Sequence, residues 1–259
     1  MEWLLRSDTV DLVAQAGFAE YFDPRDGAGL GGMDFSWTAA IDLLLYDDAA
    51  QASFSSDRIV AAFMTDVLPA ELADLDRIRT TAWRLLARGV ADRRSEFHTP
   101  TLATVEHDAP ALRTVVLRGV EESARRLWFH SDRRSAKIPA LGLNPRAAVH
   151  VYHPGLKLQL RLCGQVSVHH DDAVAAAAWS RSSPAARRTY SIDPGPGSRI
   201  SAPAEARLDA LDEAASRAVF VVLILEVTQM EWLTLAASVH RRARFVWVET
   251  GWESVWIVP

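Results

Sequence analysis

The sequence predicts a mainly β domain of the α+β class, in which a mostly antiparallel sheet closes on itself between flanking helices. Two observations predict this class. Beyond Pro100 the chain runs through many short segments rich in β-branched and aromatic residues, separated by turn or charged residues. Before Pro100, and at three places after it, the spacing of apolar residues or of alanines is that of helices.

One amphipathic helix is predicted over residues 70–90. Its apolar positions recur at helical spacing, and they are Leu72, Leu75, Ile78, Ala82, Leu85 and Leu86. Such a stripe buries one face of a helix against a core. Pro69 suits the first turn, because a backbone N–H at that position would have no partner inside the helix.

Nine strands are predicted from short alternating, β-branched or aromatic segments. They cover residues 101–106, 112–118, 127–130, 147–152, 157–169, 219–227, 231–235, 244–248 and 254–258. Helical inserts are predicted at residues 135–143, 171–179 and 204–217. Asp171 or Asp172 is suited to cap the second insert, because a carboxylate accepts hydrogen bonds from the free N–H groups of a first turn.

The chain is predicted to have three parts. Residues 1–47 are rich in glycine and aromatic residues, with a short helix expected after Ser36, and they are too few to bury a core of their own. Residues 48–69 show no sustained period, which is typical of a linker. Residues 70–259 carry the strands and form the main predicted domain.

Charge and composition exclude several classes of protein. A formal net charge of -5 argues against broad electrostatic binding of nucleic acid, which needs a clustered basic face. The longest purely apolar run, residues 218–225, is far shorter than the roughly 20 residues of a membrane-spanning helix. The N-terminus has no basic start followed by an apolar stretch, so a signal peptide is not expected. We therefore expect a cytoplasmic protein with no nucleic-acid or membrane partner.

Several cations and hydroxyls point to a phosphate site. Arg113 and Arg118 lie five residues apart on one predicted strand and therefore face opposite sides. Ser131 follows the next strand, and Ser135 and Lys137 open a predicted helix. Free N–H groups at a helix start, a lysine charge and an arginine fork all favour an anion. The alternative is that these charges are solvated, as charges at strand ends usually are.

An ordered set of segments, from residue 83 to the C-terminus, resembles the pyridoxamine 5′-phosphate oxidase family. The segments are residues 83–90, 91–100, 101–105, 113–118, 129–137, 144–145, 159–164 and 244–245, followed by Trp252 and Pro259. The order and spacing of the segments carry the resemblance, because no single motif is decisive. The resemblance implies an antiparallel FMN-binding split β-barrel, which forms a homodimer with one FMN in each of two clefts between the subunits.

The resemblance also implies which residues hold FMN. Arg113 and Lys137 match the family's phosphate ligands, with Ser135 beside Lys137 at the predicted helix start, and Gln159 matches an amide that hydrogen-bonds the flavin. The positions implied along and beside the isoalloxazine ring are Thr114, Val115, Val116, Leu117, Arg118, His130 and Ser131.

Further positions are implied near the ring and the substrate. Arg244 matches a basic residue near the ring that the chain contributes late, and Arg241 and Arg242 are alternative registers for it. Arg118 stands where the family has a lysine facing the substrate, and Arg181 matches a residue of the substrate's phosphate site.

The chain departs from the family pattern at several positions. Ala136 stands where the vitamin-processing enzyme has another phosphate-binding arginine, and residues 196–197 replace polar FMN contacts. Ala177 and Ala185 replace a tyrosine and a serine of the substrate site, and His240 replaces a substrate-binding arginine. We therefore expect a small-molecule substrate other than pyridoxine phosphate or pyridoxamine phosphate.

The function implied by the resemblance is that of an FMN-dependent oxidoreductase, an oxidase or reductase that transfers a hydride to or from flavin N5 on a small molecule. The flavin carries the redox chemistry, so no side chain is assigned as catalytic. The alternative is a non-catalytic flavin-binding or ligand-sensing module built on the same barrel.

Residues 1–47 carry a separate resemblance. Residues 20–24, 27–32 and 35–40 are similar to the last segment of (α/α)-barrel glycoside hydrolases of the trehalase and mannosylglycerate hydrolase type. Glycoside hydrolysis needs two carboxylates across a sugar site, and the helices that would form that barrel are missing from the sequence. We interpret the segment as a fusion remnant or a mis-set start. Under a third hypothesis, a carbohydrate-active protein, removal of residues 1–60 abolishes sugar binding.

No metal site is predicted. His169, His170, Asp171 and Asp172 adjoin one another, but neighbours on a strand point apart and the sequence has no second ligand pair at a metal-binding spacing. We interpret these residues as a polar strand end. The basic run at residues 240–244 is interpreted as a solvated face rather than an RNA-binding patch.

Overall fold

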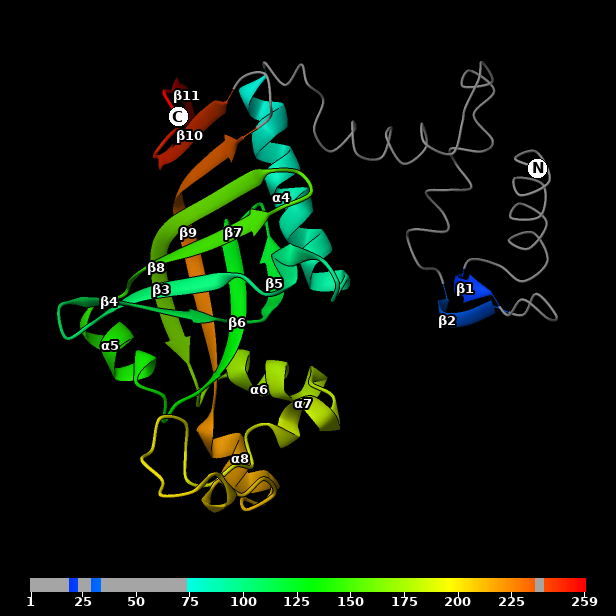
Figure 1. Ribbon diagram of the computed structural model, residues 1–259, viewed down its shortest axis with the longest axis vertical. Coiled ribbons are helices and arrows are strands. Elements are labelled where there is room, and N and C mark those ends of the chain that lie inside the picture. The colour runs from blue at the N-terminus through cyan, green and yellow to red at the C-terminus, as the bar shows by residue number, and fades with distance from the viewer. Residues whose placement is uncertain (1–18, 23–28, 34–73, 236–239) are drawn as a thin grey trace. The chain divides into compact units, whose positions relative to one another are not determined.

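The computed structural model describes residues 19–22, 29–33, 74–235 and 240–259 (Figure 1). The chain divides into two compact units, residues 1–70 and 71–259. In the first unit, β1 (Ala19–Phe22) and β2 (Gly29–Met33) pair in antiparallel fashion. The helix expected after Ser36, the linker and Pro69 lie outside the described residues. The division of the chain at residues 47 and 69 stays a prediction.

The second unit is built on a nine-stranded antiparallel sheet. Its strands are β3 (Thr101–Glu106), β4 (Ala109–Thr114), β5 (Leu117–Glu121), β6 (Arg126–Asp132), β7 (Arg146–His153), β8 (Leu158–His169), β9 (Phe220–Thr234), β10 (Arg241–Val248) and β11 (Gly251–Ile257). The main path runs β11-β10-β9-β8-β7-β3-β4, and β6 pairs with both β5 and β9. The long β9 therefore has three neighbours: β6 along its first half, β10 along its second, and β8 along both. The predicted mainly β, antiparallel class is confirmed.

Helices flank this sheet. They are α4 (Leu75–Ala91), α5 (Lys137–Leu143), α6 (Ala173–Arg181), α7 (Pro184–Arg188) and α8 (Glu213–Val219), with single 3-10 turns η2 (Glu96–His98) and η3 (Pro203–Glu205). Figure 1 shows α4 along one side of the sheet, and α6, α7 and α8 grouped at the end away from β10 and β11. None of the helices in the described part of the chain is long and apolar enough to span a membrane.

The predicted amphipathic helix is confirmed as α4, although it begins at Leu75 and not at residue 70. Asp74 sets this start, because its carboxylate accepts hydrogen bonds from the backbone N–H groups of Asp76 and Arg77 at 2.9 and 3.3 Å. Near the other end, Gly89 lies against the backbone of Phe97, where a Cβ atom would come within 2.5 Å of the Phe97 carbonyl carbon. The inward face of the helix is formed by Ile78, Ala82, Trp83, Leu85, Leu86 and Gly89.

One predicted strand, residues 112–118, is wrong, because the structure has two strands there. β4 ends at Thr114 and β5 begins at Leu117. Between them the Val115 N–H donates to the Pro100 carbonyl at 2.9 Å, outside the strand ladders. Arg113 and Arg118 consequently lie on different strands, and not on opposite faces of one.

Two predicted strands, residues 219–227 and 231–235, are a single strand, β9. Against β8, Val227 lies opposite Gly164 and Gln229 lies opposite Cys163, so one residue is extra at that point. The strand pairing continues through this bulge, so β9 does not end there. Gly164 is required there, because a Cβ atom would come within 1.9 Å of the Glu226 carbonyl oxygen.

Only the last part of the predicted helix at residues 204–217 is confirmed, as α8. The chain forms η3, then a β-bridge between Arg207 and Asp193, and α8 begins only after its cap Asp212. Asp209 has a φ of 64°, a left-handed conformation that interrupts a helix. The short helix α7 was not predicted, although Ser183 and Pro184 form a typical start for it.

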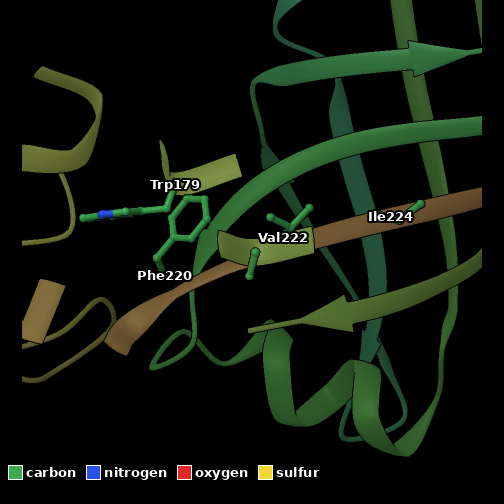
Figure 2. Close-up of a cluster of buried hydrophobic side chains, with 5 residues drawn as sticks. Trp179, Phe220, Val222 and Ile224 are labelled. Atoms are coloured by element: carbon green, nitrogen blue, oxygen red, sulfur yellow. The ribbon is translucent and has the colours of Figure 1, made fainter. Parts of the chain in front are cut away.

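Helix α6 packs on the first half of β9. The predicted helix at residues 171–179 is confirmed, and Asp172 is its cap, accepting from the Ala175 N–H at 2.9 Å. Figure 2 shows Trp179 beside Phe220, with Val222 and Ile224 farther along β9. The rings of Trp179 and Phe220 meet edge to face with centroids 5.2 Å apart. The buried cluster consists of Ala175, Trp179, Phe220, Val222 and Ile224, with Trp128, Ala178 and Tyr190 packed against it.

Candidate functional site

The side chain of Arg113 folds back along the β3–β4 hairpin. Its Nη1 donates to Thr104 Oγ1 at 2.6 Å and to the Ala111 carbonyl at 2.9 Å, and its Nη2 forms an ion pair with Glu106. The Thr104 hydroxyl in turn donates to Glu106 Oε1 at 3.1 Å. The hairpin register produces this arrangement, because Thr104 faces Ala111 and lies two residues from the partner of Arg113.

Lys137, the first residue of α5, is held by two hydroxyls. Its Nζ donates to Ser135 Oγ at 2.9 Å and to Ser131 Oγ at 3.1 Å. The Ser135 hydroxyl donates a hydrogen bond to the Asp132 backbone carbonyl at 2.7 Å. The lone pairs of Ser135 Oγ therefore remain to accept from the Lys137 ammonium. The buried Asp132 carboxylate is bound by Arg134 at 2.7 Å, which fixes the loop before α5.

Arg113 and Lys137 act on each other electrostatically. Burial and the nearby charge of Arg113 lower the pKa of Lys137, while Glu106 and Asp132 act in the opposite direction. The charge of Arg113 thus acts on Lys137, and the Lys137 ammonium is bound by Ser131 and Ser135; the sequence suggested all four residues for one phosphate site. We call Arg113, Ser131, Ser135 and Lys137 the cationic cluster.

The cationic cluster has the donors that a phosphate needs. Within the described part of the chain, Arg113 Nε has no hydrogen-bond acceptor, and Lys137 Nζ uses two of its three protons. The Glu106 carboxylate already occupies the Nη2 side of the guanidinium. Helix α5 begins at Lys137, two residues later than predicted, and has only seven residues. The fit to a phosphate therefore rests on side chains and not on the helix start.

His130 lies apart from its neighbour Ser131, because adjacent residues of a strand face opposite sides. The His130 ring meets Phe220 edge to face, with centroids 4.9 Å apart. Burial, together with the charge of Arg118, lowers the pKa of His130 to about 4, so the ring is neutral at pH 7. Burial raises the pKa of Tyr190, which also packs on Phe220, to about 12.

The four residues proposed to lie along the flavin ring, Thr114 to Leu117, differ in their exposure to solvent. Thr114 ends β4 and is exposed, and Val115 and Val116 are half-buried in the link to β5. Leu117 is 1% exposed and packs in the core, so only its backbone is available to a ligand. Arg118, which follows it on β5, is exposed.

Arg244 is bound to a buried carboxylate on the neighbouring strand. Glu231 of β9 is 4% exposed, and it accepts from Arg161 and Arg242 at 2.7 Å each and from Arg244 at 2.8 Å. Burial tends to raise the pKa of Glu231, but the hydrogen bonds from Arg242 and Arg244 and the charge of Arg161 outweigh it and lower the pKa. We call these four residues the Glu231 cluster.

Side chains on β10 alternate between the two faces of the sheet, and this separates Arg241 from Arg242 and Arg244. Arg242 and Arg244 lie on one face and both bind Glu231, whereas Arg241, which precedes Arg242, lies on the other face. On β8, Gln159 shares a face with Arg161 and is half-buried opposite Leu233. Gln159 and Arg244 therefore lie on the face that carries the Glu231 cluster.

The side chains of the other residues considered from the sequence, Arg181, His169 and Asp172, form hydrogen bonds with residues close to them in the sequence. Arg181 ends α6, is exposed, and donates from Nε to the Ala177 carbonyl of its own helix at 3.2 Å. His169 lies between Ser167 Oγ at 2.9 Å and Asp172 Oδ2 at 2.7 Å, and Asp172 also caps α6. No group of three or more potential metal ligands occurs among the residues that the structure describes.

Four charged or polar residues of these clusters, Thr104, Glu106, Arg161 and Glu231, were not proposed from the sequence as site residues. A carboxylate at position 231, between Met230 and Trp232 in an apolar run, is a sequence sign of a buried charge that needs partners. The partners themselves lie on β8 and β10, so only the strand pairing identifies them. Glu106 is likewise joined to Arg113 by the hairpin register.

Two family models match the chain. Residues 80–170 match the model described as pyridoxamine 5′-phosphate oxidase, FMN-binding domain. Residues 1–38 match the model described as mannosylglycerate hydrolase MGH1-like glycoside hydrolase domain. Both resemblances drawn from the sequence are thus confirmed, each over part of the chain.

Two curated proteins are similar to separate segments. Pyridoxine/pyridoxamine 5′-phosphate oxidase of Pseudomonas paraeruginosa is 40% identical over 67 residues, which are 26% of this chain and 30% of that protein. Mannosylglycerate hydrolase of Thermus thermophilus is 49% identical over 39 residues, which are 15% of this chain and 9% of that protein. The matches therefore span less than a third of either relative.

The solved structures that are similar over most of the chain include the following one. It is a pyridoxamine 5′-phosphate oxidase-related, FMN-binding protein from Nostoc punctiforme, with 26% sequence identity and a TM-score of 0.55. The match covers 80% of this chain and 100% of that protein. The predicted split-barrel fold is confirmed.

Proposed function

We propose that this chain is an FMN-dependent oxidoreductase. Its barrel has the split-barrel fold, and residues 80–170 match the model of the pyridoxamine 5′-phosphate oxidase FMN-binding domain. FMN, when bound, supplies hydride chemistry at its N5 position. The substrate in this proposal is a small molecule other than the vitamin phosphates. A homodimer with FMN at the interface and a cytoplasmic location belong to the same proposal.

The observation that carries the proposal is the cationic cluster. Arg113 and Lys137 both lie inside the matched region, the charge of Arg113 helps to lower the pKa of Lys137, and both side chains keep donors available for an anion. In the proposal they bind the FMN phosphate, Ser131 and Ser135 orient the ammonium, and Thr114, Val115, Val116 and Leu117 lie along the ring. Gln159 and Arg244 are proposed to approach the ring from the face of the Glu231 cluster. Arg118 and Arg181 remain the proposed substrate contacts.

A second candidate is a non-catalytic flavin-binding or ligand-sensing module. Exposed alanines favour it, because Ala177 and Ala185 stand where the resemblance expects polar substrate contacts. In that case the barrel binds flavin, and no candidate donor reduces it.

The absorbance spectrum of the purified protein is the first test, followed by release and identification of any bound chromophore. FMN affinity is then measured from the quenching of flavin fluorescence. Arg113→Gln and Lys137→Gln are each expected to weaken FMN binding by about 10- to 100-fold, the worth of a hydrogen bond to a charged group. Riboflavin, which lacks the phosphate, should bind all variants about equally.

The matched controls are Arg84→Gln and Lys157→Gln, which neutralise exposed cations outside the proposed site. Equal FMN affinity in the controls and the cluster variants contradicts the proposed phosphate site. Anaerobic mixing of the FMN-loaded protein with NADH, NADPH and small reductants separates the two candidates. Bleaching of the flavin followed by recolouring in air, with product formed, supports the oxidoreductase, and flavin that stays oxidised supports the binding module.

A further inference from the structure

The carboxylate of Glu106 lies where an anionic ligand of Arg113 would bind. It is ion-paired with Arg113 Nη2, and Thr104 completes a triangle by accepting from Arg113 and donating to Glu106. Thr104 is 3% exposed, and the side chains of Arg113 and Glu106 are 22% and 19% exposed. This is an internal ion pair with limited access to solvent, and screening by salt is correspondingly weak.

The hairpin fixes this carboxylate. Glu106 is the last residue of β3 and lies opposite Ala109, the first residue of β4. The two residues between them, His107 and Asp108, have φ angles of 49° and 62°, as the tight type I′ turn requires. Glu106 therefore belongs to a short, rigid turn and not to a long loop that could carry it away from Arg113.

The charge of Glu106 also acts on Lys137, the second cation of the cluster. It raises the pKa of Lys137, against the effects of burial and of Arg113. A phosphate that bound Arg113 and Lys137 together would lie close to this carboxylate and be repelled by it, or would have to displace it from the guanidinium. Either route costs binding free energy.

We propose that Glu106 is a specificity-determining residue, an internal counter-anion that weakens the binding of phosphate-bearing ligands to the cationic cluster. It lowers the preference of the protein for FMN over riboflavin and leaves the cofactor exchangeable. The identity of the ligand as FMN rests on the proposed function, whereas the effect of Glu106 on phosphate rests on the cluster alone.

The test is Glu106→Gln, which keeps the size of the side chain and an oxygen that accepts from Arg113 and Thr104 but removes the charge. Dissociation constants for FMN and riboflavin are measured by fluorescence at fixed ionic strength. In parallel, the rise in Tm caused by inorganic phosphate is compared with that in chloride at equal ionic strength. Glu106→Ala is the second charge-removing variant, and Glu249→Gln, at an exposed glutamate, is the matched control.

The expected result is an FMN dissociation constant about tenfold lower in Glu106→Gln, from the loss of one like charge near the phosphate, with riboflavin changed less than twofold. Phosphate should raise the Tm of this variant more than that of the wild type. Adding Arg113→Gln to the same chain should remove the gain, because the freed guanidinium is its source.

Three outcomes overturn the proposal: unchanged or weaker binding of FMN and phosphate in both Glu106 variants, an equal gain for riboflavin, or an equal gain in the Glu249 control. The first of these would make Glu106 a residue that positions Arg113 for its ligand. If neither flavin binds the wild type or any variant, the proposed function fails, and the phosphate measurement still decides the role of Glu106.

Discussion

The burial of His130 predicts a specific dependence of stability on pH. The imidazole packs edge to face on Phe220 and lies under the influence of the Arg118 charge. Burial is the larger cause and the guanidinium the smaller, and together they lower the pKa of His130 from 6.5 to about 4. The folded protein therefore resists protonation of this ring at a pH where the unfolded chain accepts the proton.

The size of the effect follows from linkage. A group with a lowered folded pKa takes up its proton first in the unfolded state, so the free energy of unfolding falls as pH drops from 6.5 towards 4. A difference of about 2.5 pKa units amounts to about 3 kcal/mol once the pH is well below 4, and to about 2.5 kcal/mol at pH 4.5. Above pH 7.5 the ring is neutral in both states and contributes almost nothing.

The assay compares the wild type with His130→Phe, which keeps an aromatic ring against Phe220 but cannot titrate. Urea unfolding of both proteins is measured at pH 7.5, 6.0, 5.0 and 4.5, without added ligands. The stability of the variant relative to the wild type should rise by about 2.5 kcal/mol between pH 7.5 and 4.5. His240→Gln, which removes an exposed histidine, should leave the wild-type pH profile unchanged.

The pKa itself can be measured by NMR titration of the imidazole, assigned by its absence in His130→Phe. The expected midpoint is near pH 4, and Arg118→Gln should move it upward, because the second cause of the shift is gone. Parallel stability profiles for the wild type and His130→Phe, or a midpoint near 6.5, would refute the reasoning, since either result means that the ring is solvated.

Three further changes test the packing of the barrel by urea unfolding. Gly164→Ala should destabilise by about 3 kcal/mol, because the added methyl group meets the Glu226 carbonyl at the β8–β9 bulge. Gly142→Ala in α5 is its control, since open space surrounds that position, and a similar loss there would contradict the account. Phe220→Ala should cost about 3–5 kcal/mol, because it empties the centre of the cluster under α6, and a loss below about 1 kcal/mol would rule out that role. Asp172→Ala should cost about 1 kcal/mol through loss of the α6 cap, and helical signal equal to the wild type with unchanged stability would show that the cap is dispensable.

Features that depend on neighbouring residues were predictable. The bounds of β3 and the cap of α6 at Asp172 agree with the sequence analysis, and α4 differs mainly at its start. Helical spacing, strand alternation and capping are properties of residues a few positions apart, so the sequence contains them directly. The resemblance added the split barrel, which the fold confirms, and it implied one site for Arg113 and Lys137, which stays a prediction.

Features that depend on strand pairing were not predictable. Val115 bonds to Pro100 and divides one predicted strand, whereas the bulge opposite Gly164 lets β9 continue where two strands were expected. The pairing also decides which charges meet, so Glu106 and Glu231 entered no sequence-based site. Glu106 binds its arginine across a hairpin, and Glu231 binds its arginines across two strand pairs. A pattern of neighbouring residues in the sequence does not show which strands pair.

The sequence by itself determined the class of fold, the order of most elements and the two cations of the proposed phosphate site, because spacing along the chain and an ordered set of short segments carry that information. Only the tertiary structure decided that two of the candidate arginines, Arg113 and Arg244, already have a carboxylate partner. The reason is physical: a charge removed from water must be compensated by whatever group the fold brings within a few ångströms, and that group is chosen by register and pairing.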